Sequence, residues 1–556
     1  EIKAKKSNSF GFMALKPVEK VYVYSGKKSE VILPAKLPAN KATNNARQVF
    51  AKVSGLNIWE SDCAGLQLGI GGRGLSPNRS THFNTRQNHY DISADALGYP
   101  ESYYSPPVQA IYRVEVVRGA AGLQYGPQLG GLVNFILKDD QQTQQGNGSV
   151  QITGGSNQFL NLFADYGKKS GKWMYYAYLQ RKSGNCFRPN SAFNLLGGHA
   201  YLKYNWSNNG GVSVEVTAMD YLTQQAGGLT DRQFELDPYT STRERNWFRV
   251  NWNLFALKID QNWSNGWRFS SNNFGLVADR TSLGFLGPIH RPDPNAERDI
   301  IDGTFQNIGS ENRFLKTYFI GTAPSSLAFG FRLYRGTSEA YQGLAPAGKD
   351  AKFERLDNGL KSDYRYPNNN ASLFLENVFS VNKKLKITPG ARFEYINTQA
   401  DGEIRNVVTD GIGDTILDQT IPDALRNERT VLLGGIGFSY AYSKDLKFYA
   451  NASTNYRPVN FTDLKIVNPS FAVDPNLEDE RGYNIDFGIK LDREDDLAMD
   501  LSFFYLGYRN RIGEIHKVQE GTGQLIRYRT NVSQSRNTGI ESYIEKVVYQ
   551  GTHSRL

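Results

Sequence analysis

From residue 146 onward, hydrophobic and polar residues alternate along many segments, as in β-strands that have two different faces. The connections between these segments are alternately short and long. We expect short connections at residues 167–171, 207–211, 264–266, 323–326, 382–384, 443–445 and 492–496, and long ones at 183–198, 223–245, 280–312, 337–370, 398–430 and 457–481. An antiparallel meander with its short turns on one rim predicts a bacterial transmembrane β-barrel. A generic all-β repeat protein is the alternative.

The composition is compatible with a barrel. The 556 residues include 54 glycines, 32 tyrosines and 31 phenylalanines, and no apolar run is long enough for a membrane-spanning helix. The net charge of +9 would suit an anionic ligand, but no recognised nucleic-acid motif accompanies it, so we expect no nucleic-acid partner. With only Cys63 and Cys186 present, we expect no disulfide framework. No secretory signal begins at Glu1, so we interpret the chain as mature.

Residues 114–138, VEVVRGAAGLQYGPQLGGLVNFILK, carry the most information. Two β-branched runs flank several glycines and a proline, which predicts a small, tightly turned sheet rather than a helix. A nucleotide-binding GxGxxG motif would need a helix where a second β-rich run follows. The stretch resembles the end of the plug domain of TonB-dependent outer-membrane receptors, with its pattern E-V-x-R-G, Y-G and G-G-x-x-N. The combination R-G, Y-G-P-Q and G-G-L-V-N-F most resembles the ferric dicitrate branch of that family.

Further motifs extend this resemblance along nearly the whole chain. Residues 44–58 resemble the family's R-Q-x-F-x-x-x-x-G-L element and residues 70–74 its I-R-I-R-G strand end, while residues 456–458, 474–480 and 537–541 match barrel motifs in order. The resemblance implies an all-β transmembrane barrel of the 22-stranded type around an N-terminal α+β plug domain in the lumen. We place the plug at residues 1–142 and the barrel at residues 143–556.

We count about 16 strands by residue 546, so about six closing strands are expected to be missing. We expect the sequence to be incomplete, because an open sheet edge in lipid would leave backbone groups unpaired. The alternative is that something else covers the gap.

The sequence shows no catalytic constellation. Its six histidines are scattered without the spacing of a zinc site, no G-x-S-x-G elbow occurs, and the two cysteines lie far apart. We therefore expect a protein that is not an enzyme and has no resident metal or cofactor. A ferric chelate would be its transported ligand.

Residues 75–107 are polar, aromatic and too long for a hairpin, and the resemblance places part of them in plug loops facing the extracellular vestibule. Arginine and tyrosine suit an anionic chelate, because guanidinium groups pair with carboxylates and phenols donate hydrogen bonds. Each residue alone could equally be a solvated loop residue. We expect Arg79 and Arg86 to share a cavity with arginines of the long loops. The candidate ligand-binding residues are Arg79, His82, Arg86, Gln87, Tyr103, Tyr104, Arg243, Arg245 and Arg365.

Comparison with the haem receptors of the resembled family narrows the ligand class. Haem receptors of the family have a histidine in the region corresponding to residues 456–477, and this sequence has none there. Ferric citrate, a compact anion with many carboxylate oxygens, is our first expectation. Another ferric siderophore, cobalamin and a non-transporting surface receptor are the alternatives.

The resemblance also implies partners and moving parts. We expect a monomeric barrel in the outer membrane of a Gram-negative bacterium, surrounded by lipid and lipopolysaccharide and energised by TonB with ExbB and ExbD. Tyr22 and Val23 faintly resemble the TonB-contacting strand, although they could equally form the first plug strand.

Arg73 and Arg118 each precede a glycine at a plug strand end. We expect them to form a plug–barrel latch with Glu394 and Asp486; the alternative is that each arginine only caps a turn.

Overall fold

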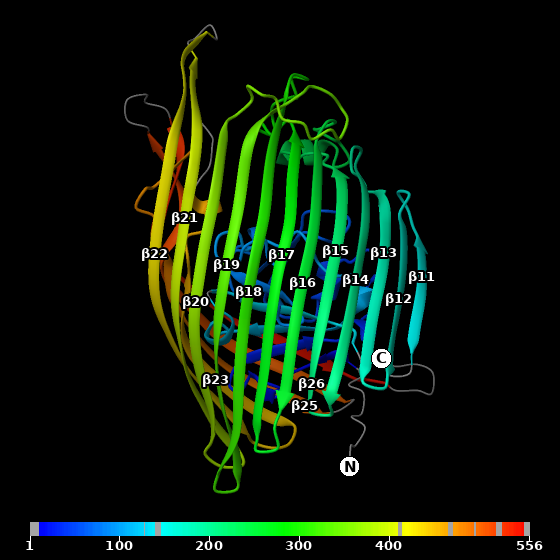
Figure 1. Cartoon of the computed structure of the whole chain (residues 1–556), viewed down its shortest axis with the longest axis vertical. Helices are drawn as coiled ribbons and strands as arrows, with labels where there is room; N and C mark the ends of the chain where they lie inside the picture. Colours follow the sequence, from blue (N-terminus) through cyan, green and yellow to red (C-terminus); the bar gives the residue numbers. More distant parts are fainter. Residues whose placement is uncertain are drawn as a thin grey trace.

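The computed structural model describes residues 10–126, 128–139, 146–409, 414–464, 471–493, 496–518 and 525–549. A tall curved wall of long strands partly encloses the N-terminal segments, which lie on its concave side (Figure 1). The N-terminal part holds a six-stranded sheet and two small hairpins, whereas the wall is one 17-stranded sheet. Among the described residues, no helix is long and apolar enough to cross a membrane.

The N-terminal part, called the plug below, has its six strands in the order β1-β4-β9-β10-β7-β8, and its hairpins are β2–β3 and β5–β6. Its strands are β1 (Phe12–Met13), β2 (Val18–Glu19), β3 (Tyr22–Val23), β4 (Lys28–Ile32), β5 (Leu56–Glu60), β6 (Leu68–Gly72), β7 (Phe83–Gln87), β8 (Tyr90–Asp91), β9 (Ile111–Arg118) and β10 (Gly131–Leu137). Its short helices are η1 (Pro34–Lys36), α1 (Ala46–Val49), η2 (Asn78–Ser80), η3 (Val108–Ala110) and α2 (Gly122–Tyr125).

The glycine-rich stretch forms the centre of the plug. β9 and β10 are its two β-branched runs, and they pair antiparallel, with Val116 opposite Val133. The short helix α2 lies between them, where we expected turns alone. Most side chains of both strands are buried, which explains why the two runs are continuously apolar rather than alternating.

The wall is a meander of consecutive antiparallel strands, interrupted only by the short β24. Its strands are β11 (Asn147–Gly154), β12 (Leu160–Ser170), β13 (Trp173–Asn185), β14 (Ala192–Ser207), β15 (Gly210–Gln224), β16 (Trp247–Asn262), β17 (Trp267–Gly284), β18 (Arg298–Ile320), β19 (Ala323–Ala345), β20 (Ser362–Ser380), β21 (Leu385–Thr409), β22 (Thr415–Ala441), β23 (Leu446–Arg457), β24 (Phe471–Val473), β25 (Glu480–Arg493), β26 (Leu497–Val518) and β27 (Leu525–Lys546). Helices α4 (Asp231–Leu236) and α5 (Phe461–Leu464) lie in its connections.

The predicted rim of short turns is confirmed. The turns after β12, β14, β16, β18, β20 and β22 are short, and those visible in Figure 1 lie at its lower edge, away from the long connections. The turn predicted at residues 492–496 includes residues 494–495, which lie outside the described residues.

Several expected long loops are largely strand. β18 to β22 are 19 to 27 residues long, far more than the 9–11 residues that cross a bilayer. The connection between β19 and β20 shrinks accordingly, to residues 346–361. Beyond the membrane both faces of a strand meet polar surroundings, so the alternation that reveals a strand in the sequence fades there.

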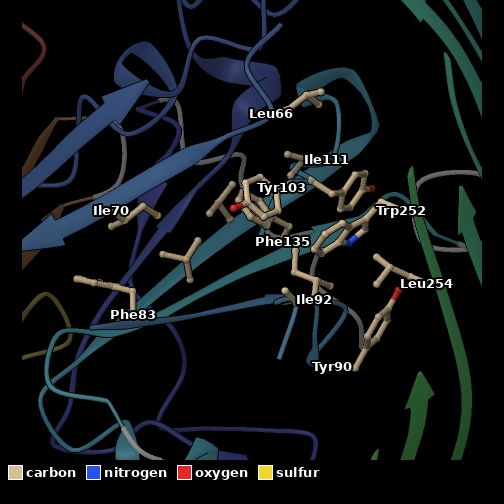
Figure 2. Packing of buried hydrophobic residues seen from close by; sticks show 14 of the residues in the cluster. Leu66, Ile70, Phe83, Tyr90, Ile92, Tyr103, Ile111, Phe135, Trp252 and Leu254 are labelled. Carbon is tan, nitrogen blue, oxygen red and sulfur yellow. The ribbon is translucent and has the colours of Figure 1, made fainter. Parts of the chain in front are cut away.

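Alternation along the wall follows its two environments. In β13, Met174, Tyr176 and Tyr178 are buried and face inward, while Trp173 and Leu179 are exposed on the outer face. An apolar outer face with aromatic residues is what a lipid-facing barrel requires. The inner side chains pack on the plug in one large cluster, in which Tyr103 of the plug lies against Trp252 of β16 (Figure 2).

Candidate ligand cavity and the plug–barrel interface

A cavity of about 990 Å³ lies between plug loops and the wall. The plug contributes residues of η2 and the segment after it, together with Tyr99. The wall contributes the ends of β17, β18, β19, β20 and β26 that lead into the long connections. The cavity is therefore on the long-connection side of the plug, and it is large enough for a small-molecule site.

Arg79 is held at the cavity in an uncommon backbone conformation. Its φ is 55°, in the left-handed region that costs a non-glycine residue free energy unless the surroundings hold it there. Its guanidinium carbon lies 5.8 Å from the centre of the Tyr99 ring, and Nε lies 3.8 Å from a carboxylate oxygen of Glu101. The side chain is 44% exposed, so its charge remains available to a ligand.

His82 is a neutral, buried member of the cavity. Burial, reinforced by the nearby charges of Arg457 and Arg511, lowers the pKa of its imidazole well below the usual value. Nδ1 lies 3.9 Å from Glu480 and has no hydrogen-bond partner within the described residues. The ring can thus donate or accept one hydrogen bond to a ligand without adding charge.

Charges of both signs line the cavity. Five cationic side chains face six carboxylates: Arg79, Arg280, Lys361, Arg457 and Arg529 against Asp299, Asp302, Glu339, Asp463, Glu480 and Glu514. Several of these are already paired; Arg457, for example, lies 2.7 Å from Asp463 and 3.7 Å from Glu480. The cavity is amphoteric rather than a basic funnel.

One edge of the cavity is aromatic. The rings of Tyr364 and Tyr366 stack at 5.8 Å, and Phe461 of α5 stacks on Tyr366 at 4.3 Å. Phe461 also lies against the plug: a Cβ at Gly98 would sit 1.8 Å from its ring, so a larger residue there would displace the ring. The backbone N–H of Phe461 donates to the Gly98 carbonyl at 2.9 Å, which joins α5 to the plug loop.

Four of the plug candidates do not line this cavity. Arg86 is fully buried and forms a bidentate ion pair with Glu311 of β18 at 2.8 and 2.9 Å, so its predicted role at the cavity is wrong. Gln87 and Tyr104 bond to each other and to the wall through Thr217 and Tyr178.

Tyr103 also lies inside the interface. It packs against Phe248 and Trp252, and its hydroxyl bonds to that of Tyr99 at 2.7 Å. These four side chains connect the plug to the barrel and are not placed to bind a chelate.

The loop arginines have structural partners. Arg243 and Arg245 line a second cavity of about 750 Å³, away from Arg79. Among the described residues, the guanidinium of Arg243 donates only to backbone carbonyls, including those of Phe285 and Pro288. Arg245 pairs with Asp293 at 2.5 Å. Arg365 lies 3.8 Å from Glu339 and lines neither cavity. Arg79 shares its cavity with Arg280 and Arg457, which lie at the ends of expected long connections. The expected shared cavity of plug and loop arginines is therefore found for Arg79, but with other loop arginines than the three predicted.

The plug–barrel latch has a different membership from the one expected. Arg73 lies 2.5 Å from Asp486 and 3.2 Å from Glu541 of β27, and Arg118 lies 2.7 Å from Glu541 and also pairs with Glu30. Both arginines are buried at ion pairs with the wall rather than capping turns in water.

Glu394 is the wrong partner for either latch arginine. It accepts hydrogen bonds from Arg392 and Tyr456 of the wall instead. Glu541 was missed as a partner, although its motif, residues 537–541, had been recognised.

The predicted TonB contact is also inaccessible in this conformation. Val23 is fully buried and Tyr22 is 1% exposed. The Tyr22 ring stacks on His89 at 4.1 Å and lies under the Arg313 guanidinium at 5.0 Å. These residues fill the space between plug and wall, so they present no surface to another protein here.

Cys63 and Cys186 form a disulfide, which corrects the expectation drawn from the cysteine count. The two Cα atoms are 5.9 Å apart although 123 residues separate them in sequence. Cys63 follows β5 of the plug, and Cys186 follows β13 of the wall. Beside the bridge, Nζ of Lys182 donates to the Ala64 carbonyl at 2.9 Å. The disulfide therefore links the two parts of the molecule covalently.

The fold is shared with solved outer-membrane transporters. The ferric citrate transporter FecA in its unliganded form superposes with a TM-score of 0.74 at 18% identity, covering 93% of this chain and 74% of that chain. The copper transporter OprC gives 0.70 at 13%, covering 96% and 78%. The ferric yersiniabactin uptake receptor FyuA of Yersinia pestis gives 0.71 at 14%, covering 95% and 77%. At these identities the likeness concerns the fold.

Sequence relatives point the same way. An iron-regulated outer membrane virulence protein of Vibrio cholerae serotype O1 is 40% identical over 76 residues, which are 14% of this chain and only 10% of that protein. The family model "TonB-dependent Receptor Plug Domain" matches residues 25–133, and "TonB dependent receptor-like, beta-barrel" matches residues 187–545. Because the barrel model alone covers more than half of the chain, the chain belongs to the TonB-dependent receptor family and is a plugged β-barrel of the Gram-negative outer membrane.

Proposed function

We propose that this receptor imports a ferric chelate through the outer membrane, using energy supplied by TonB with ExbB and ExbD. The observation that carries the proposal is the cavity of about 990 Å³ on the long-connection side of the plug. Its half-exposed Arg79 and neutral His82 can bind oxygen atoms of a chelate from the plug side. The iron-regulated and ferric-chelate relatives named above support iron as the cargo.

Ferric citrate is our first candidate ligand. The R-G, Y-G-P-Q and G-G-L-V-N-F motifs support it, and so does the exposed guanidinium of Arg79, which can pair with a carboxylate. The second candidate is a ferric siderophore with aromatic groups. The stacked rings of Tyr364, Tyr366 and Phe461 favour it, because they can pack against aromatic groups of the ligand.

Binding measurements on the purified receptor test both candidates. Ferric citrate, a ferric tris-catecholate chelate and the iron-free ligands would be titrated calorimetrically at fixed salt. Saturable binding of an iron-loaded chelate, and not of its iron-free form, is the expected result. Failure of every ferric chelate to bind would refute iron import, whereas binding of the catecholate alone would exclude ferric citrate.

A further inference from the structure

We propose that the Cys63–Cys186 disulfide is a mechanical stop, which allows only the plug segment before Cys63 to be pulled out of the barrel. This inference rests on the proposed function, because it assumes that a partner pulls the plug from its N-terminal side. Tension that enters there runs along the backbone until it reaches residue 63. At that residue the chain is covalently joined to the wall, so the tension passes into the barrel and not into the rest of the plug.

The wall side of the disulfide is firmly held. Cys186 lies in the connection of residues 186–191, where the Arg188 guanidinium donates to the carbonyls of Gly227 and Thr240 at 2.7 and 2.9 Å. Asn190 donates to the Ser241 hydroxyl at 3.1 Å. The connection that carries Cys186 is therefore fastened to the next one, residues 225–246.

A second set of contacts extends this bracing. Arg243 donates to the carbonyls of Phe285 and Gly287 at 3.1 Å, and Arg245 binds Asp293, so residues 225–246 are fastened to residues 285–297. The two arginines expected to bind ligand thus hold two long connections together, and Arg188 and Asn190 add the connection that carries Cys186. A pull on Cys63 is resisted by this whole set rather than by one loose loop.

The segment before Cys63 is placed to separate from the plug. In the six-stranded sheet, β1 and β4 occupy one edge, and the order β9-β10-β7-β8 follows. Removal of residues 10–62 therefore peels the edge and breaks the pairing of β4 with β9, together with that of β5 with β6. The pairing of β9 with β10, and of β10 with β7, stays intact because all three strands follow Cys63.

The vacated region adjoins a polar part of the wall. Lys27 pairs with Glu376 of β20 at 2.7 Å, and Lys28 lies 3.1 Å from Glu541 of β27. Lys490 of β25 donates to the Ser29 carbonyl at 2.7 Å. Once water enters, these charged groups are rehydrated, which offsets much of the loss of their partners. The opening would therefore run between β9 and the wall formed by β20 to β27.

Pulling single receptors by the N-terminus tests the stop. The full-length receptor would be held in a lipid bilayer and extended from an N-terminal tag, without any chelate or TonB. In the oxidised receptor, extension from residue 10 should end after about 190 Å, since a stretched chain spans at most about 3.6 Å per residue. In the Cys63→Ser/Cys186→Ser double variant it should continue to about 460 Å, when the plug up to residue 139 has left. Wild-type receptor treated with a phosphine reductant should behave like the variant, which covers the case in which the variant folds poorly.

Two results would overturn the proposal: equal extension of oxidised and reduced wild-type receptor, or two alkylatable thiols in unreduced receptor. The outcome is independent of the proposed cargo, because no ligand is present. A receptor that binds no ferric chelate but stops at 190 Å would refute iron import and keep the stop. A receptor that binds a ferric chelate but shows no stop would support iron import and refute the stop.

Discussion

The two sides of the plug–barrel interface are built from different chemistry. Toward β13 to β17, the plug presents aromatic rings, such as Tyr103 against Phe248 and Tyr90 against Phe274, and the disulfide lies on the same side. Toward β18 to β27, it presents buried cations that pair with carboxylates of the wall: Lys27, Lys28, Arg73, Arg86 and Arg118. One side is anchored, and the other is held by charge.

This difference bears on how a plug can be both stable and removable. Separating apolar surfaces exposes them to water and costs free energy in proportion to their area. Separating buried ion pairs costs less than their Coulomb attraction suggests, because both ions regain hydration. The charged side is thus stable while water is excluded from the interface and becomes separable once water enters it. The aromatic side resists separation in both conditions.

The largest effect is expected from Glu541→Gln. This carboxylate is shared by Arg73, Arg118 and Lys28, and neutralising it leaves three buried cations with too few partners. The free energy that holds the plug in the barrel should fall by about 3–5 kcal/mol, the range for removing one partner of a buried ion pair. Hydrogen exchange of the β4 and β9 amides measures it.

Glu514→Gln is the matched control. Glu514 lies on the neighbouring strand β26, is 36% exposed and pairs with Arg529, so its replacement should cost less than about 1 kcal/mol. If the β4 and β9 amide hydrogens exchanged equally fast in the two variants, the shared role of Glu541 would be refuted.

A smaller effect is expected from Tyr103→Leu on the anchored side. The change removes ring contacts with Phe248 and Trp252 and the hydroxyl bond to Tyr99, at a cost of about 2 kcal/mol. Urea unfolding of the receptor in detergent measures the cost. Raising the salt concentration should change this cost little, because the ring contacts of Tyr103 are apolar except for the Arg280 guanidinium, 5.5 Å from the ring centre. A strong salt dependence would contradict the apolar description of this side.

The sequence was sufficient for the architecture and for part of the interface. Alternation revealed the strands and the rim of short turns, and the R-G motifs located Arg73 and Arg118. Local sequence could not show which way Arg86 faces. That depends on β7, which pairs in parallel with β10, placing Arg86 opposite Asn134. A parallel pairing between segments almost 50 residues apart leaves no local signal of its register.

The same limit applies to the disulfide and to the loop arginines. Cys63 and Cys186 become neighbours only when the plug has docked inside the wall, so counting cysteines could not pair them. Arg243 donates hydrogen bonds to backbone carbonyls of a connection about 40 residues further along the chain. Nothing in the neighbouring sequence distinguishes that role from ligand binding. Residue type suggested the chemistry, and only the fold supplied the partner.

Arg79→Ala should act on ligand binding and not on stability. Its side chain is half-exposed and its ion pair with Glu101 is long, at 3.8 Å, so the fold does not depend on it. Its loss should weaken binding of the chelate about tenfold, equal to about 1.4 kcal/mol. Arg365→Ala is the control, because Arg365 lines neither cavity. Calorimetric titration of the chelate into both variants provides the comparison, and equal affinities would remove Arg79 from the site.

The smallest expected effect is a pH dependence that originates at His82. Its pKa in the folded receptor lies well below 6.5, because burial and then the charges of Arg457 and Arg511 disfavour the imidazolium. The unfolded chain binds the proton near pH 6.5 and the folded receptor does not, so stability present above that pH is lost as the pH falls through it. Between pH 7.5 and 6.0 the wild-type receptor should lose about 1 kcal/mol more than His82→Gln, whose side chain does not titrate. Urea unfolding of both proteins at the two pH values isolates this contribution, since every other titrating group is common to them. An equal loss in the two proteins would mean that the pKa of His82 is the same in the folded and unfolded states. The cavity would then gain a positive charge toward a ligand as the pH falls below about 6.5.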